Sequence, residues 1–116
     1  GKIPAFANAF PELNHNEMVG FSNLQGLSGK FAAIFLADPG DDTKIQKRMH
    51  ATQNIIREKG HDVIAVDLTG TTFWQKSFSG IIAAMWTSYH LAGYYGVDPE
   101  DATVIEDFKK SLTANP

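Results

Sequence analysis

The side chains of this chain that could do acid–base chemistry are concentrated near its start. Two amides flank an imidazole in the run Asn14-His15-Asn16, and a carboxylate follows at Glu17. An imidazole changes its charge close to neutral pH, so His15 can act both as a general acid and as a general base. Proton transfer is the chemistry that this cluster favours, with His15 as the first candidate.

The same run has a structural interpretation that the sequence leaves open. Asn14 is a suitable helix N-cap, and Glu17, three places later, could complete a capping box. A cap accounts for neither His15 nor Asn16. We expect Asn14 and Glu17 either to bind substrate or to contact the residues that bind it. We expect Glu17 to have a structural rather than a catalytic role.

Two aspartates are weaker candidates. Asp38 and Asp67 lie at the carboxyl ends of the two predicted strands described below, the positions where open α/β sheets bind ligands. Turn formation within Asp38-Pro39-Gly40 is the commoner role for such a residue.

The composition favours neither a metal nor a cofactor. The chain has no cysteine, and its other histidines, His50, His61 and His90, share no metal-ligand spacing. The glycines do not form a strand-to-helix phosphate loop. We therefore predict no metal site and no cofactor.

Length and charge limit the partners. The chain has 116 residues, which fits one domain, and 43% of them are apolar. A formal net charge of −3 with mixed signs provides no basic stripe for nucleic acid and no cationic helix for a membrane surface. Residues 73–95 contain too many polar groups for an unassisted bilayer span. The lack of cysteine agrees with a cytoplasmic protein.

The positioning elements begin with a predicted strand–helix–strand unit. Residues 31–37 form a continuous apolar run typical of a strand buried on both faces, and residues 62–68 form a second such run. Asp41 and Asp42 are candidate caps for a helix between them, and Gly60 is its candidate stop. This helix carries one buried face at helical spacing: Ile45, Met49, Thr52 and Ile56. A right-handed βαβ unit is the natural interpretation.

Two further helices are predicted after this unit. The first runs from about Thr72 to Tyr94, and its apolar residues cover more than one face, so it needs partners on several sides. The second begins at Asp98-Pro99, a cap followed by proline, and ends near Thr113. Two parallel strands cannot form a doubly covered sheet, so we expect missing sequence or another subunit to complete it.

Motifs at both ends of the chain match those of one enzyme family. Residues 2–6 and 11–17 are similar to the later parts of a motif that runs from Asn-Glu-Asn-Ala-Lys to Pro-Glu-Leu-Asn-His-Asn-Glu. Residues 88–92, 96–99 and 105–112 are similar to the same family's Ser-x-Tyr-Leu-Ala helix, Gly-Val-Asp-Pro turn and last helix. The whole chain thus resembles the bifunctional phosphoglucose/phosphomannose isomerases, which are sugar isomerase (SIS) enzymes.

The resemblance implies roles for two side chains. His15 aligns with the family's histidine that is implicated in opening the sugar ring and that is thought to reach the partner subunit's active site. Lys109 aligns with the active-site lysine, although a lysine in the last turn of a helix is usually a solvated residue. The family's catalytic glutamate belongs to Asn-Glu-Asn-Ala-Lys and would lie just upstream of Gly1.

The resemblance also implies a fold and an activity. The fold would be a three-layer SIS-type, flavodoxin-like parallel sheet flanked by helices, of which residues 1–116 are a partial C-terminal SIS domain excised from a longer isomerase. The activity would interconvert glucose 6-phosphate and mannose 6-phosphate with fructose 6-phosphate in glycolysis and gluconeogenesis. The implied partners are a hexose 6-phosphate, the missing N-terminal SIS domain and a second copy in a homodimer. We expect the chain alone to be inactive.

Two other functions stay open. One is a non-catalytic SIS-like module that binds a sugar phosphate for regulation, and the residues directly upstream would distinguish it from an enzyme. The other is a phospho-receiver domain, because Asp67 at a strand end beside Thr69 suits phosphoryl chemistry. A receiver also needs an acidic pair after its first strand and five strands, of which only parts are visible.

Overall fold

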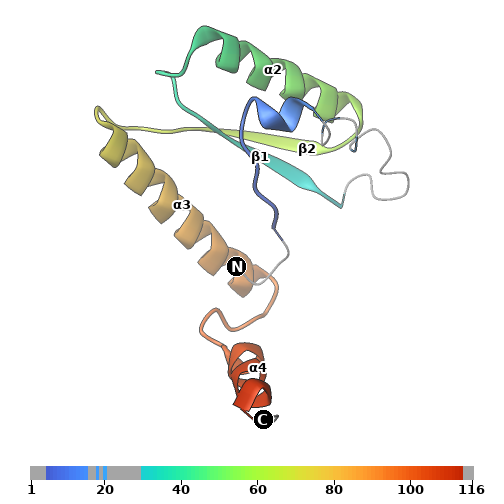
Figure 1. Cartoon of the computed structure of the whole chain (residues 1–116), viewed down its shortest axis with the longest axis vertical. Coiled ribbons are helices and arrows are strands. Elements are labelled where there is room, and N and C mark those ends of the chain that lie inside the picture. The colour runs from blue at the N-terminus through green and yellow to red at the C-terminus, as the bar shows by residue number, and fades with distance from the viewer. Residues whose placement is uncertain (1–4, 16–17, 19, 21–29, 114–116) are drawn as a thin grey trace. The chain divides into compact units, whose positions relative to one another are not determined.

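The computed structural model of the chain describes residues 5–15, 18, 20 and 30–113. In chain order the elements are a one-turn 3-10 helix η1 (Glu12–Asn14), β1 (Ala32–Ala37), α2 (Thr43–Glu58), β2 (Asp62–Asp67), α3 (Phe73–Tyr94) and α4 (Thr103–Thr113), as drawn in Figure 1. The chain divides into two compact units. One spans Phe6–Ile82, and the other contains the chain from Ala83 onward.

The first unit is built on the predicted strand–helix–strand pattern. β1 and β2 pair in parallel, with Ala32 opposite Asp62. α2 begins after Asp42, whose carboxylate accepts a hydrogen bond from the Lys44 backbone N–H at 2.7 Å. Gly60 follows the helix with φ at +83°, a conformation that glycine adopts without steric cost. Figure 1 shows α2 lying along one face of the strand pair.

A small apolar core lies between α2 and the strands. Phe35 of β1 meets Met49 and Ile56 of α2, and none of these side chains is more than 8% exposed. Burying a side chain of this size contributes about 1.5–3 kcal/mol relative to leaving it in water. Partly buried residues packed against this cluster are Phe10, Ala33, Ala37 and Val63. The predicted buried face of the helix is thus confirmed at Met49, Thr52 and Ile56.

The prediction that the strands are buried on both faces is wrong for the described residues. Successive side chains of a strand point to opposite faces, so the neighbours of Phe35 point away from α2. Four apolar side chains on that second face are 36–55% exposed: Ile34, Leu36, Ile64 and Val66. The reason is that α2 covers one face of the pair, while the described residues supply no equivalent layer on the other.

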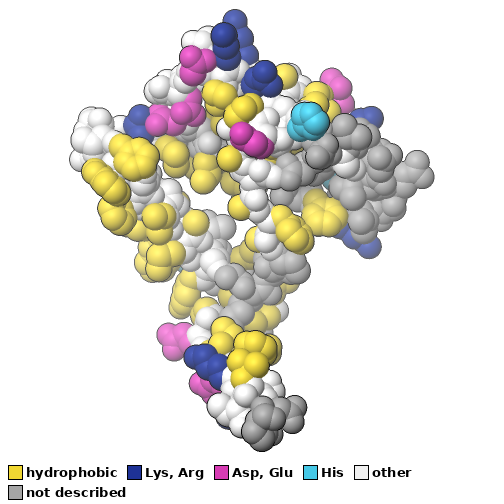
Figure 2. Space-filling model, in the orientation of Figure 1, with side chains coloured by type: hydrophobic (Ala, Val, Ile, Leu, Met, Phe, Trp, Pro, Cys, Tyr) yellow, Lys and Arg dark blue, Asp and Glu magenta, His cyan; other side chains and the backbone are white. Residues whose placement is uncertain are grey.

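The predicted long helix is confirmed as α3. Many of its apolar side chains are more than half exposed: Phe73, Trp74, Phe78, Ile81, Ile82, Met85, Trp86 and Tyr89. Figure 2 shows hydrophobic side chains at the surface along this helix. No helix that the structure describes combines the length and the hydropathy needed to cross a bilayer.

The predicted start of the last helix at Asp98-Pro99 is wrong, because α4 begins at Thr103. The Asp98 carboxylate accepts from the Glu100 backbone N–H at 2.9 Å and so holds a turn. The Asp101 carboxylate accepts from the Thr103 backbone N–H, also at 2.9 Å. Both aspartates can satisfy free backbone N–H groups, and the later one does so at the start of the helix.

Candidate active site

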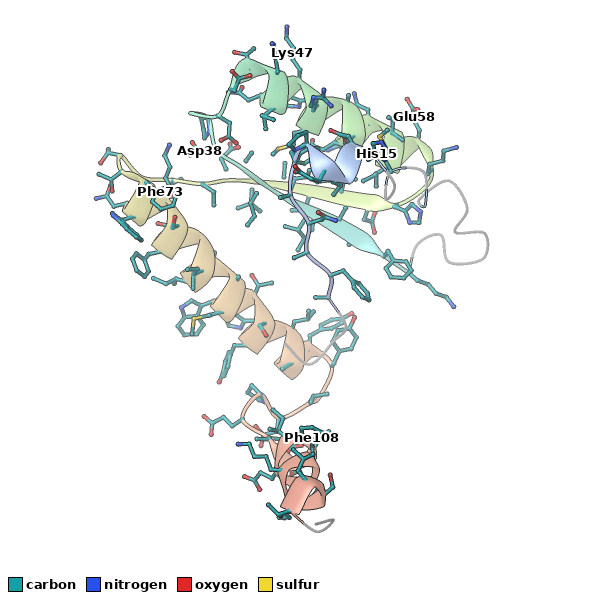
Figure 3. All side chains as sticks on the ribbon, viewed as in Figure 1. His15, Asp38, Lys47, Glu58, Phe73 and Phe108 are labelled. Carbon is teal, nitrogen blue, oxygen red and sulfur yellow. The ribbon has the colours of Figure 1, made fainter. Side chains whose placement is uncertain are left out.

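The candidate acid–base residue His15 directly follows the turn η1. The turn is closed by backbone hydrogen bonds from Asn14 to the Pro11 carbonyl and from His15 to the Glu12 carbonyl, each 3.0 Å long. The His15 side chain is exposed. Figure 3 shows it at the end of the turn, on the side of α2. An exposed imidazole on a hydrogen-bonded turn is accessible to a substrate.

Contacts between described residues tie this turn to the rest of its unit, one before the turn and one at its end. Before the turn, the ring of Phe10 lies 6.1 Å from the ring of Phe35, measured between centroids. At its end, the side-chain amide of Asn14 donates a hydrogen bond to the Thr52 hydroxyl at 2.7 Å. The first contact reaches β1 and the second reaches α2. The place of His15 therefore depends on the folded unit as well as on the turn.

Asn14 does not cap a helix in the part of the chain that the structure describes. Its amide nitrogen points to Thr52, with a longer contact of 3.9 Å to the sulfur of Met18. Its Oδ1 atom is buried and accepts no hydrogen bond from a described residue. Glu17 and the neighbouring Asn16 lie outside the described residues, so the supporting role expected for Glu17 stays a prediction.

Lys109 lies on α4, in the other unit, and its side chain is exposed. Its neighbour Lys110 forms an ion pair with Asp107 at 3.3 Å. Lys109 forms no hydrogen bond or ion pair with the described residues. Since His15 and Lys109 belong to different units, their convergence on one sugar ring stays a prediction.

The carboxyl ends of β1 and β2 hold a second set of polar groups. The Asp38 carboxylate accepts from the Gly40 backbone N–H at 2.7 Å and from the Lys76 ammonium at 2.6 Å. The hydrogen bond from Lys76, and then that from Gly40, lowers the pKa of the Asp38 carboxyl. The expected turn at Asp38 is confirmed. The ion pair to Lys76 was not predicted.

A pocket of about 200 Å³ opens beside these strand ends. Its polar lining comes from the strand ends and α2: Asp38, Asp41, Gln46, His50, Gln53 and Asp67. The described lining residues include three carboxylates, and one of them, Asp38, is paired with the Lys76 ammonium. In the described part of the chain, no group of three or more His, Asp or Glu side chains could hold a metal ion.

The fold and the site define an α/β chain in which an exposed histidine is carried on a turn docked against a parallel strand–helix–strand unit. The chain belongs to the family described as bacterial phospho-glucose isomerase C-terminal SIS domain, which it matches over residues 1–112. The resemblance read from the two terminal motifs is thereby confirmed.

Curated relatives agree with this family. The chain is 32% identical to a bifunctional phosphoglucose/phosphomannose isomerase of Aquifex aeolicus over 96% of its length. It is 35% and 34% identical to the proteins of the same name from Thermoplasma volcanium and Thermoplasma acidophilum, over 96% and 97% of its length. In all three cases the match covers 34% of the relative, so the chain spans about a third of their length. No solved structure shows a significant match.

Proposed function

We propose that this chain is the C-terminal part of a sugar-phosphate isomerase that interconverts glucose 6-phosphate and mannose 6-phosphate with fructose 6-phosphate. The observation that carries the proposal is the family match over residues 1–112. The names of the relatives, which are phosphoglucose/phosphomannose isomerases, point to the same reaction. The exposed His15 and Lys109, which binds no described residue, are side chains that this reaction can use.

In the proposed reaction His15 opens the sugar ring. The ring oxygen gains a proton as its bond to C1 breaks, and the C1 hydroxyl loses one, which leaves the open-chain aldehyde. An imidazole suits this step because it can deliver and accept a proton at neutral pH. The exposure of His15, directly after η1, supports this role, since the sugar ring must approach the imidazole directly.

Isomerisation then moves one proton between neighbouring carbons. A carboxylate takes the proton from C2 of the open aldose, which gives a cis-enediol, and returns it to C1, while the hydroxyl proton passes from O2 to O1. We assign this base to a glutamate outside the chain, in the part of the family motif that precedes residue 1. The Lys109 ammonium stabilises the negative charge that develops on the enediolate oxygens.

In the complete protein we propose that residues 1–116 form part of a three-layer, flavodoxin-like SIS domain. The apolar face of the β1–β2 pair supports this, because parallel sheets are normally covered on both sides. Its cover would come from chain outside these residues. The N-terminal SIS domain and a second copy of the protein are the proposed partners, and the exposed aromatic side chains of α3 are available for such contacts.

The test compares this chain alone with the two-domain protein, meaning the chain joined to its preceding SIS domain. Both are assayed for conversion of fructose 6-phosphate to glucose 6-phosphate and mannose 6-phosphate. We expect turnover by the two-domain protein and none by the chain alone, because the proposed base lies outside this chain. Binding of fructose 6-phosphate without turnover by the two-domain protein would instead favour the regulatory module.

A further inference from the structure

We infer that Thr52 is a positioning residue for His15: its hydroxyl holds Asn14, and through Asn14 the turn that carries His15, against α2. The inference rests on the proposed function, in which His15 opens the sugar ring. It assigns a functional role to a helix residue that the motif comparison did not select.

The Thr52 hydroxyl is oriented by its own helix. The side chain is 1% exposed, and its hydroxyl donates to the Arg48 carbonyl, one turn earlier, at 2.8 Å. With its proton used there, the oxygen can only accept, and it accepts from the Asn14 amide at 2.7 Å. Because a β-branched side chain has few allowed rotamers in a helix, the position of this acceptor follows from the backbone of α2.

The Asn14 amide has no comparable second anchor among the described residues. The sulfur of Met18 lies 3.9 Å from its nitrogen and is a weak acceptor. Its buried Oδ1 atom has no described partner. Removal of the Thr52 hydroxyl would leave a partly buried donor without a strong acceptor among the described residues, which favours movement of the amide.

A movement of Asn14 is transmitted to His15. The two residues are adjacent, and both backbone N–H groups are bonded within the same short turn. A further anchor, the apolar contact between Phe10 and Phe35, precedes the turn. Without the bond to Thr52, the turn can pivot about Phe10 and displace the imidazole. A misplacement of about 1 Å can cost roughly a hundredfold in rate.

The first experiment uses Thr52→Val and Thr52→Ser in the two-domain protein. Valine keeps the shape and removes the hydroxyl, whereas serine keeps the hydroxyl. We expect Thr52→Val to lower kcat roughly ten- to a hundredfold with little change in KM, because the displaced group is an acid–base group. Thr52→Ser should recover most of the loss. A kcat of Thr52→Val equal to that of the wild type would overturn the inference.

A second experiment separates positioning from a general effect on folding. If Thr52 acts through His15, the loss from Thr52→Val should disappear in a His15→Ala background, since the group being positioned is already absent. The double variant should then be no slower than His15→Ala. Losses that multiply would show that Thr52 affects the enzyme by another route, and the inference would be wrong.

Two controls keep the outcomes distinct. Thermal unfolding shows whether each variant is folded, and Thr52→Ala replaces Thr52→Val as the hydroxyl-free variant if the latter is not. An inactive wild-type two-domain protein would contradict the proposed function itself. The Thr52 inference alone would be contradicted by a different set of results. In that case the wild type is active, His15→Ala is inactive, and the variants without the Thr52 hydroxyl are fully active.

Discussion

Two neighbouring lysines of α4 differ in their interactions. Lys110 is paired with Asp107 at 3.3 Å, whereas Lys109 binds none of the described residues. The ion pair between Lys110 and Asp107 is exposed, and such surface pairs contribute little to stability. The Lys109 ammonium can instead approach a substrate oxyanion. The pair therefore offers a matched test at the level of single residues.

We predict that Lys109→Gln lowers kcat of the two-domain protein roughly 10²- to 10³-fold, the usual cost of losing one stabilising group of a developing oxyanion. Lys110→Gln is the control, because it removes the same charge one residue away, and it should stay close to the wild type. Steady-state assays with fructose 6-phosphate measure both. Equal losses of kcat in the two variants would mean that activity depends on the net charge of α4 and not on a specific role of Lys109.

His15 can be compared with another exposed histidine. We predict that His15→Ala abolishes most turnover of closed-ring sugar phosphate, because general acid–base catalysis contributes about 10²- to 10⁴-fold. His50→Ala, an exposed position on α2, should leave turnover unchanged. Steady-state kinetics of the two variants in the two-domain protein check this. Similar losses would remove the case for His15.

Asp38 provides a pH prediction. The hydrogen bond from Lys76 lowers the pKa of the folded carboxyl, so folding is favoured by the ionised form. This contribution is fully present above the ordinary pKa of 3.8 and is lost as the pH falls through the lower folded value. The free energy of unfolding of the wild type should exceed that of Asp38→Asn at neutral pH, and the difference should shrink in strong acid. A difference independent of pH would exclude this cause.

At the scale of elements, α2 connects the core to the turn that carries His15. Its inner face supplies Met49 and Ile56 to the core and Thr52 to the turn. A helix packed firmly on the strands can therefore serve as the base on which the turn rests. Loss of packing between α2 and the strands should therefore weaken both the core and the attachment of the turn that carries His15.

We predict that Ile56→Ala destabilises α2 by about 2–5 kcal/mol, because Ile56 is 1% exposed and its truncation leaves a cavity. The matched control is Asn54→Ala, on the exposed face of the same helix. Native-state hydrogen exchange at the α2 amides measures the local free energy of opening in the two-domain protein. Equal protection in both variants would show that the core described here does not stabilise the helix.

The strand–helix–strand unit was predictable because its signals are local. The continuous apolar runs of the strands, the helical spacing of α2 and its cap at Asp42 involve residues only a few positions apart. The start of α4 was missed because Asp98 and Asp101 both suit a cap, and their competition depends on the turn between them. The apolar runs predicted strands covered on both faces, with missing sequence or another subunit completing the sheet, and the described residues leave the second face exposed.

At the scale of the whole molecule, the apolar sheet face bears on assembly. Ile34 and Leu36 lie opposite Ile64 and Val66 in the parallel register, so the four side chains form one continuous patch. All four are partly exposed. Such a patch favours contact with further protein surface.

We predict that the separately produced preceding domain and this chain regain isomerase activity when mixed, with activity rising with concentration. Ile64→Lys should weaken this recovery, since it places a charge in an interface that must lose its water. Asn54→Lys, which adds the same charge on the exposed side of α2, should recover normally. Titration of activity against the concentration of the chain compares the two. Equal recovery would mean that this face is not the contact surface.

The linear chain was enough to identify its main strands and helices and its family, because each depends on residue types at short or aligned spacings, whereas the proton-transfer role of His15 stays a prediction. The linear chain did not reveal what holds His15 or neutralises Asp38. The bonds from Asn14 to Thr52 and from Lys76 to Asp38 each join residues 38 positions apart. Such pairs meet only after the strands have paired and α2 has packed on them, so no local pattern encodes them.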